Sequence, residues 1–244
     1  MDNNDKKEGI ILKSTKYGDN SLVVNILTHD SGLQPYIIKN VYGNKKGGRA
    51  ALLQNTNIVN FVTIHNKLRS PIGQLKDIEI GYFYNTIPFD MNKMAIALFI
   101  SEICAKTITG QEKNEDLYNF VRNSLTKLDA TNENLANFPI CFVIGLCQHL
   151  GFAPMNNYSD NFYFDMTEGH FCTQMPDTHN YYFDLEKSRI LSSFLTSDTF
   201  VNLPFRMSGE TRRQLLDGLI TFVRLHASVM GSIQSHEILR QVLS

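Results

Sequence analysis

This sequence lacks several features that mark secreted, membrane and disulfide-linked proteins. It contains no tryptophan, and its four cysteines show no paired spacing. Three of the cysteines lie in apolar stretches that are predicted to be helical, where a cysteine usually packs as a small hydrophobe. The longest apolar runs, Met94–Ile100 and Ile140–Cys147, fall short of the roughly 18 residues that a membrane span needs. Residues 1–8 are polar and carry no apolar signal segment, so we expect a cytoplasmic protein without membrane contact.

A strong net charge is also lacking, but the charges are unevenly placed. The formal net charge of the 244 residues is −1. Residues 1–80 hold 11 Lys and Arg against 7 Asp and Glu, which is +4. Residues 81–244 hold 12 against 17, which is −5. The asymmetry favours two modules, and it places in the first one the cations that a polyanion would need.

The first eighty residues have the pattern of short β-strands. Turn signals, such as Gly18-Asp19-Asn20 and Ser31-Gly32, separate runs rich in Val, Ile, Phe and Tyr. Roughly five short strands in so short a region predict a small barrel, since closure removes exposed sheet edges. The clearest strand runs are Ser21–Leu27, Leu33–Lys39, Asn57–His65 and Gln74–Ile80.

The pattern becomes helical after Pro88. Asp90 is the predicted N-cap of a helix to about residue 109, and its apolar run predicts burial on all sides. Later helices are expected at about 114–128, 133–150, 185–196, 208–223 and 235–243. The aromatic and polar segment between the third and fourth helix has weak strand character. We therefore predict two domains, residues 1–82 and residues 83–244, with an irregular insert at about 154–184.

Arrangements that carry catalysis are lacking. No G-x-S-x-G motif is present, and no Ser, His and acid show the spacing of a triad. The glycines and lysines at 43–48 match neither the Walker pattern nor the dinucleotide fingerprint. Zinc sites usually contain closely paired ligands, and that pairing is absent here. The nearest set is His170, Cys172 and His179, with Asp165 or Asp177. We predict no catalytic residue, no metal and no cofactor.

What is present is a basic surface with interspersed aromatic residues. Phosphates are bound by mobile cations, and bases stack on flat aromatic faces. On composition alone, an ordinary solvated surface is an equal alternative. Tyr17 and Lys76 lie near the predicted DNA-binding residues, which are Lys13, Lys16, Lys39, Tyr42, Lys45, Lys46, Arg49, Lys67 and Arg69.

Several short motifs stand in a fixed order along the chain. They are E-G-I-I-L-K-S-T-K-Y-G-D-N-S-L-V-V at 8–24, L-T-H-D-S-G-L at 27–33, V-Y-G-N-K-K at 41–46, L-G-F-A-P at 150–154, E-G-H-F at 168–171, R-L-H at 224–226 and the ending at 235–239. In this order and spacing they resemble the RecO family of bacterial recombination mediators, from the first strands to the C-terminal end.

The resemblance implies an α+β chain with an N-terminal OB-fold β-barrel followed by an α-helical domain. It implies a DNA repair and recombination protein, not an enzyme, that binds single- and double-stranded DNA and anneals complementary strands. It also implies work with RecR to load RecA onto DNA coated by single-stranded DNA-binding protein. Many family members carry a four-cysteine zinc module after L-G-F-A-P. This chain has only Cys172 between Tyr158 and Phe183, so we expect aromatic packing there instead.

The resemblance further implies that the helical domain captures the acidic C-terminal tail of single-stranded DNA-binding protein. Such a tail needs an apolar groove and a cation, ideally an arginine. The helix that Ser208 is expected to cap offers both, although solvated arginines and core leucines are the plain alternative. The predicted partner-binding residues are Leu203, Phe205, Arg206, Arg212, Arg213 and Leu216.

Two other classes of function stay open on the sequence. A small-molecule-binding protein or enzyme would place a pocket between barrel and helices. A transcription factor would need a helix–turn–helix with a basic recognition helix, for which Arg206, Arg212 and Arg213 form a thin cluster.

Overall fold

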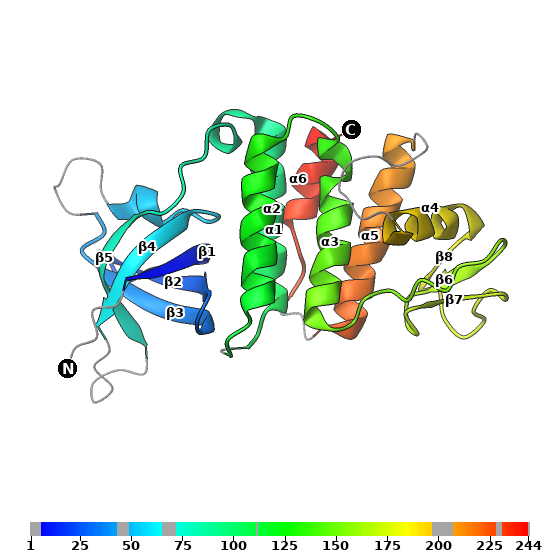
Figure 1. Ribbon diagram of the computed structural model, residues 1–244, viewed down its shortest axis with the longest axis horizontal. Coiled ribbons are helices and arrows are strands. Elements are labelled where there is room, and N and C mark those ends of the chain that lie inside the picture. The colour runs from blue at the N-terminus through cyan, green and yellow to red at the C-terminus, as the bar shows by residue number, and fades with distance from the viewer. Residues whose placement is uncertain are drawn as a thin grey trace.

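The computed structural model has a barrel at one end, a small sheet at the other and helices between them (Figure 1). Among the described residues, no helix is long and apolar enough to cross a membrane. The structure describes residues 6–42, 49–64, 72–110, 112–196, 207–227 and 231–243.

Five strands close the N-terminal barrel in the order β1-β2-β3-β5-β4. Antiparallel pairing of β1 with β4 closes the ring, and β3 runs parallel to β5. This confirms the predicted OB-fold barrel followed by helices. The strands are β1 (Lys7–Tyr17), β2 (Ser21–Thr28), β3 (Gly32–Lys39), β4 (Ile58–Ile64) and β5 (Gly73–Ile80), with a 3₁₀ turn, η1 (Arg49–Leu53), before β4.

The interior of the barrel is filled by alternate residues of its strands. Ile11, Val24 and Ile38 are fully buried there, and Tyr36 packs edge-on against Phe61. A side chain at Gly9 would place its Cβ 2.4 Å from Cγ2 of Ile26. The close approach of β1 and β2 therefore requires glycine at this position.

In the part of the chain that the structure describes, six α-helices follow the barrel, linked to it by residues 81–90 and the short η2 (Ile87–Phe89). The cap predictions are confirmed. The Asp90 side chain accepts from the N–H groups of Asn92 and Lys93, and Ser208 accepts from Thr211. Gly151 has a φ of 84°, which suits glycine at a helix end. The helices are α1 (Met91–Thr107), α2 (Glu115–Ala130), α3 (Phe138–Leu150, after η3 at Leu135–Asn137), α4 (Leu185–Thr196), α5 (Gly209–His226) and α6 (Ser235–Val242).

The expectation that the apolar run of α1 is buried all round is wrong in part. Ile96 and Ile100 are fully buried, but Met94 and Leu98 are 43% and 37% exposed. The barrel and the other helices cover only part of the circumference of α1, so one stripe of its surface faces solvent.

The insert between α3 and α4 is a three-stranded sheet in the order β7-β6-β8. Phe164 lies at its centre and contacts Phe171, Phe183 and Phe222 of α5. These contacts confirm that aromatic packing holds the segment. The strands are β6 (Tyr163–Asp165), β7 (His170–Cys172) and β8 (Tyr182–Phe183).

Barrel and helices share one continuous core at their junction. Ile10 and Leu27 on the outside of the barrel belong to the same buried cluster as α1. The Ser101 hydroxyl donates to the carbonyl of Leu12 at 2.7 Å. Asp129, only 2% exposed, accepts hydrogen bonds from three consecutive backbone N–H groups at 85–87, so α2 also fixes the linker.

Candidate nucleic-acid interface

The outer face of β1, β2 and β3 forms a three-stranded platform. Residues directly opposite one another in antiparallel strands point to the same side of the sheet. The register therefore defines rows across the outer face, which are Ile10–Leu27–Leu33, Lys13–Asn25–Pro35, Thr15–Val23–Ile37 and Tyr17–Ser21–Lys39.

A shift in register divides this outer face into two parts. The shift lies between Ile11 and Lys13, where β1 carries one extra residue relative to β2. Ile10 and Leu27, before the shift, are buried under the helices. Lys13 and Lys39, beyond it, are exposed. We call the three rows from Lys13 to Lys39 the open face.

Aromatic rings flank one end of the open face. Tyr17 is 60% exposed and Tyr42 is 52% exposed, so neither ring packs inside the barrel. A hydrogen bond from the N–H of Val41 to the carbonyl of Asn20 joins the β1–β2 turn to the segment after β3. The two tyrosines therefore lie at the same end of the barrel, beside Lys16 and Lys39.

The described lysines of this region have no carboxylate partner among the described residues. Within the described ranges, Lys13, Lys16 and Lys39 take part in no ion pair, and the one carboxylate in the adjacent turn is Asp19. Lys6 and Lys7, by contrast, bind Glu79 and Asp30 at 2.5 and 2.6 Å. Lys13, Lys16 and Lys39 therefore have ammonium groups available for phosphate, as does the exposed Lys76 of β5.

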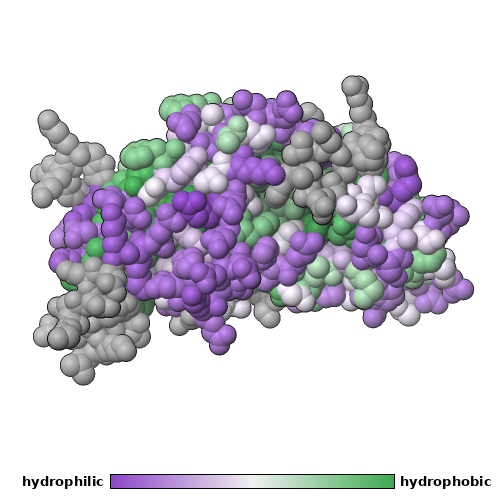
Figure 2. Space-filling view, viewed as in Figure 1, coloured by the Kyte–Doolittle hydropathy of each residue, from purple (hydrophilic) through white to green (hydrophobic). Residues whose placement is uncertain are grey.

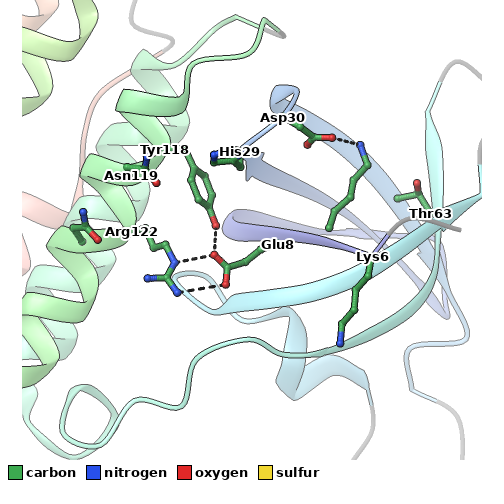
Figure 3. Close-up of a pocket in the computed structure, with 10 residues that line it drawn as sticks. Lys6, Glu8, His29, Asp30, Thr63, Tyr118, Asn119 and Arg122 are labelled. Carbon is green, nitrogen blue, oxygen red and sulfur yellow. Dashed lines mark hydrogen bonds and ion pairs between the residues drawn. The ribbon is translucent and has the colours of Figure 1, made fainter. Parts of the chain in front are cut away.

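A pocket lies between the barrel and α2. It is a pocket of about 770 Å³ in which Arg122 donates to Glu8 at 2.7 Å and the Tyr118 hydroxyl donates to the same carboxylate at 2.7 Å (Figure 3). Burial alone would raise the pKa of Glu8, but these two hydrogen bonds lower it below its ordinary value. The complete lining is Lys6, Lys7, Glu8, His29, Asp30, Thr63, Tyr118, Asn119, Arg122 and Asn123.

Both the barrel and the helical part of the chain match models of known protein families. Residues 1–83 match the family model described as "Recombination protein O N terminal". Residues 88–229 match the model described as "Recombination protein O C terminal". The chain belongs to the RecO family. It is a protein of DNA repair and recombination.

Relatives named DNA repair protein RecO match the chain over nearly its full length. The protein from Flavobacterium psychrophilum is 28% identical over 242 residues, which cover 98% of this chain and 99% of the relative. The protein from Bacteroides fragilis is 26% identical over 238 residues, covering 97% and 98%. The protein from Porphyromonas gingivalis is 28% identical over 235 residues, covering 94% and 95%.

The structure brings part of the predicted DNA-binding set of this RecO-family chain together. Lys13 and Lys39 lie on the open face, and Lys16 and Tyr42 lie at its end. Arg49 is exposed at the start of η1. Four further predicted residues, Lys45, Lys46, Lys67 and Arg69, fall outside the described residues.

The predicted partner-binding set is only partly placed at the surface. Leu216 is 8% exposed and packs in the main core, so the expectation that it lines an open groove is wrong. Arg213 is bound to Glu210. Arg212 is half-buried and donates to neutral oxygens, those of the Asn137 side chain and the Met207 carbonyl. Leu203, Phe205 and Arg206 fall outside the described residues.

His179 and Cys172 of the insert form hydrogen bonds within the protein. Nε2 of His179 lies 2.8 Å from the Thr167 hydroxyl, and its Nδ1 accepts from the N–H of Tyr181. The Cys172 thiol donates to the Gln174 carbonyl at 3.1 Å. Across the part of the chain that the structure describes, no group of three or more His, Cys, Asp or Glu is arranged to hold a metal ion.

Sequence reasoning missed the pocket between barrel and α2. Its residues come from β1, the β2–β3 turn, β4 and α2, and no periodic pattern joins them. The polar residues along one side of α2 are the one feature that indicates the pocket. Exposed asparagines at i and i+4, Asn119 and Asn123, follow one side of α2, and hydrophilic side chains cover α2 and the adjoining side of the barrel in Figure 2.

Proposed function

We propose that this chain binds single-stranded DNA on the open face and acts as a recombination mediator without catalysing a reaction. The observation that supports this most is the row register, which puts Lys13, Tyr17 and Lys39 on one exposed surface. Cations there neutralise phosphates, and exposed tyrosine rings offer planes on which bases stack.

The same charges support strand annealing. Two complementary strands repel each other through their phosphates, and a protein that neutralises phosphates removes part of that repulsion. Contacts through phosphate and stacked bases carry little sequence information, so binding is expected to be sequence-tolerant. Double-stranded DNA is expected to bind through phosphate contacts alone.

The helical domain is the proposed docking surface for protein partners, RecR and single-stranded DNA-binding protein, and through them for RecA. For the acidic tail of single-stranded DNA-binding protein, Arg212 is the cation best suited. Its guanidinium has no carboxylate partner among the described residues, whereas Arg213 is bound to Glu210. It also lies in the first turn of α5, where free N–H groups favour an anion.

A charge-reversal variant tests the DNA site. Lys13→Glu, Lys16→Glu and Lys39→Glu together should lower affinity for a fluorescent oligonucleotide by about 10-fold or more and slow annealing. The matched control reverses Lys113, Lys187 and Arg224 in the helical domain, which changes the net charge equally. An equal loss of affinity in both variants would show that the net charge alone determines binding. No loss of affinity in the first variant would place the DNA elsewhere.

Peptide titration tests the partner site separately. A synthetic acidic, apolar-ended tail should bind the parent and bind the Arg212→Glu, Arg213→Glu variant much more weakly. Unchanged binding by that variant would move the site to another part of the domain. If the parent binds no peptide, the tail is not a partner of this chain.

A further inference from the structure

The pocket between the barrel and α2 has charges that differ from those of the open face. Each of its cations is already matched with a carboxylate. Lys6 pairs with Glu79, Lys7 with Asp30 and Arg122 with Glu8, all within 2.7 Å. The Lys7 ammonium lies 2.6 Å from Asp30. Figure 3 shows Glu8 between Tyr118 and Arg122, across an open space from Asp30.

These carboxylates stay ionised at neutral pH. Partial burial would raise the pKa of Asp30, but the Lys7 ammonium lowers it below its ordinary value. The pKa of Glu8 is lowered in the same way by Arg122 and Tyr118. A phosphate entering the pocket would meet ionised carboxylates and cations that are already neutralised. The pocket therefore does not favour the DNA backbone.

What the pocket does offer is polar edges for a neutral, planar group. The side-chain amides of Asn119 and Asn123 form no hydrogen bond with any described residue and face solvent along α2. The His29 side chain is 44% exposed, and its ring meets Tyr118 in a T-shaped arrangement with centroids 5.6 Å apart. Asparagine amides and carboxylates are the side chains that read the amino and ring-nitrogen edges of bases, and aromatic rings stack on base faces.

We propose that this pocket receives one unpaired nucleobase of a bound DNA strand, held by the Asn119 and Asn123 amides and the His29 ring. This inference rests on the single-strand binding proposed above. The pocket volume of about 770 Å³ is in the range of pockets that enclose small ligands, roughly 300–1,000 Å³. An unpaired base also exposes the edge that base pairing uses, and a duplex cannot present that edge to the amides.

The open face and the pocket would then bind different parts of the same DNA strand. The open face would hold the backbone, and the pocket would keep one base out of its stack. A strand bound in this way keeps a base unpaired until a complementary strand competes for it, which suits a protein that anneals strands.

The test uses an oligothymidine with a single 2-aminopurine, whose fluorescence rises when it leaves the stack. The parent should raise the fluorescence on binding. Asn119→Ala with Asn123→Ala should remove most of that rise and weaken binding about 5- to 10-fold, because the base would have no amide to bind. The salt dependence of binding should stay that of the parent, since the phosphate contacts are unchanged.

Two controls make the result specific. Asn119 and Asn123 also border a neighbouring pocket that contains His149, so His149→Ala should leave the fluorescence rise intact. Gln241→Ala removes an exposed amide from α6 and should also have no effect. A loss with His149→Ala equal to that of the asparagine variant would overturn the proposal in favour of the neighbouring pocket.

The remaining outcomes separate the base pocket from the DNA site itself. A parent that binds no oligonucleotide would refute the proposed function. Normal binding with an unchanged rise in the asparagine variant would refute the pocket alone. Free 2-aminopurine riboside should show little binding, because the strand is needed for anchoring. Tight binding of the riboside that the asparagine variant loses, with strand binding unaffected, would show a nucleoside site and overturn the proposal.

Discussion

The lysines on the open face and at its end differ from the cations of the helical domain in what surrounds them. Among the described residues, Lys13, Lys16 and Lys39 have no carboxylate within ion-pair distance. The cations of the helical domain mostly have one. Those in ion pairs are Lys106, Lys113, Arg122, Lys187, Arg213 and Arg240.

The difference shows how a chain with a net charge of −1 can present a basic surface. Paired cations contribute to structure, because their charge is already matched within the protein. Unpaired cations at the surface contribute little to stability and remain free to exchange counter-ions for phosphates. Substitutions should therefore divide into those that change unfolding and those that change DNA binding.

The largest effect on unfolding is expected at Asp129. This carboxylate is 2% exposed and accepts from the N–H groups of Asn85, Thr86 and Ile87. Asp129→Ala leaves those donors unsatisfied and should lower the free energy of unfolding by about 3 kcal/mol or more. Urea denaturation measures this, with the exposed Glu133→Ala as control. A decrease below about 1 kcal/mol would show that the linker does not depend on this carboxylate.

The pH dependence of that contribution has a definite sign. Burial would raise the pKa of Asp129, but the backbone N–H groups lower it below its ordinary value. A lowered carboxyl pKa stabilises the fold above the unfolded pKa of about 3.9, and the contribution is lost as pH falls through the folded value. The parent should lose stability over this acid range more steeply than Asp129→Asn.

A smaller and more local effect is expected where α6 begins. Glu102 accepts from the N–H groups of Gln234 and Ser235 and binds Lys106. Burial would raise its pKa, but the bonds from Lys106, Ser235 and Gln234 lower the pKa of Glu102 to about 2. The anchoring of α6 should weaken as pH falls from about 4.3 toward that value. Faster amide exchange in α6 at low pH would show it, and Glu102→Gln should remove the pH dependence.

The capping residues illustrate what the sequence predicts well. Asp90, Ser208 and Gly151 act through hydrogen bonds or backbone conformation within a few residues, so local sequence is enough to identify them. The barrel was also predictable, because its strands carry the β-rich runs and turn signals. The strand β1 does not show the alternation of apolar and polar residues, since Ile10, Ile11 and Leu12 are consecutive apolar residues. Both faces of β1 are covered at this point, because Ile10 and Leu12 lie in the core shared with the helices and Ile11 lies in the barrel interior.

The candidate site was predictable in composition but not in arrangement. Lysines and tyrosines in the first half indicated a basic surface. Their sharing of one face depends on the register of three strands and on the irregularity in β1. The pocket at α2 depends on how the barrel packs against α2, since Glu8 and Arg122 are 114 residues apart. Nothing in the local sequence of either residue carries that information.

The ion pair at the junction should contribute moderately to stability. Glu8 and Arg122 are about one-third exposed, at 31% and 30%. A double-mutant cycle with Glu8→Gln and Arg122→Gln should give a coupling energy of about 1 kcal/mol, at the upper end for partly exposed pairs. A coupling energy near zero would mean that this ion pair does not help to hold barrel and helices together.

The smallest effect on unfolding is expected for the lysines on the open face and at its end. Lys13→Ala, Lys16→Ala and Lys39→Ala should each change the free energy of unfolding by less than about 0.5 kcal/mol, because their side chains are exposed and unpaired. Thermal or urea unfolding of the three single variants measures this. A clear destabilisation would show that these lysines serve the barrel itself.

The salt dependence of single-strand binding tests the open face most directly. The logarithm of the association constant should fall linearly with the logarithm of salt concentration for the parent. Replacing Lys13, Lys16 and Lys39 together by alanine should make that slope shallower by about 2, because each phosphate that a protein neutralises on a single strand adds roughly 0.7 to it. The variant that replaces Lys113, Lys187 and Arg224 by alanine should keep the slope of the parent. An unchanged slope in the open-face variant would mean that these lysines do not bind phosphate, and it would contradict the assignment of this face as the DNA-binding surface.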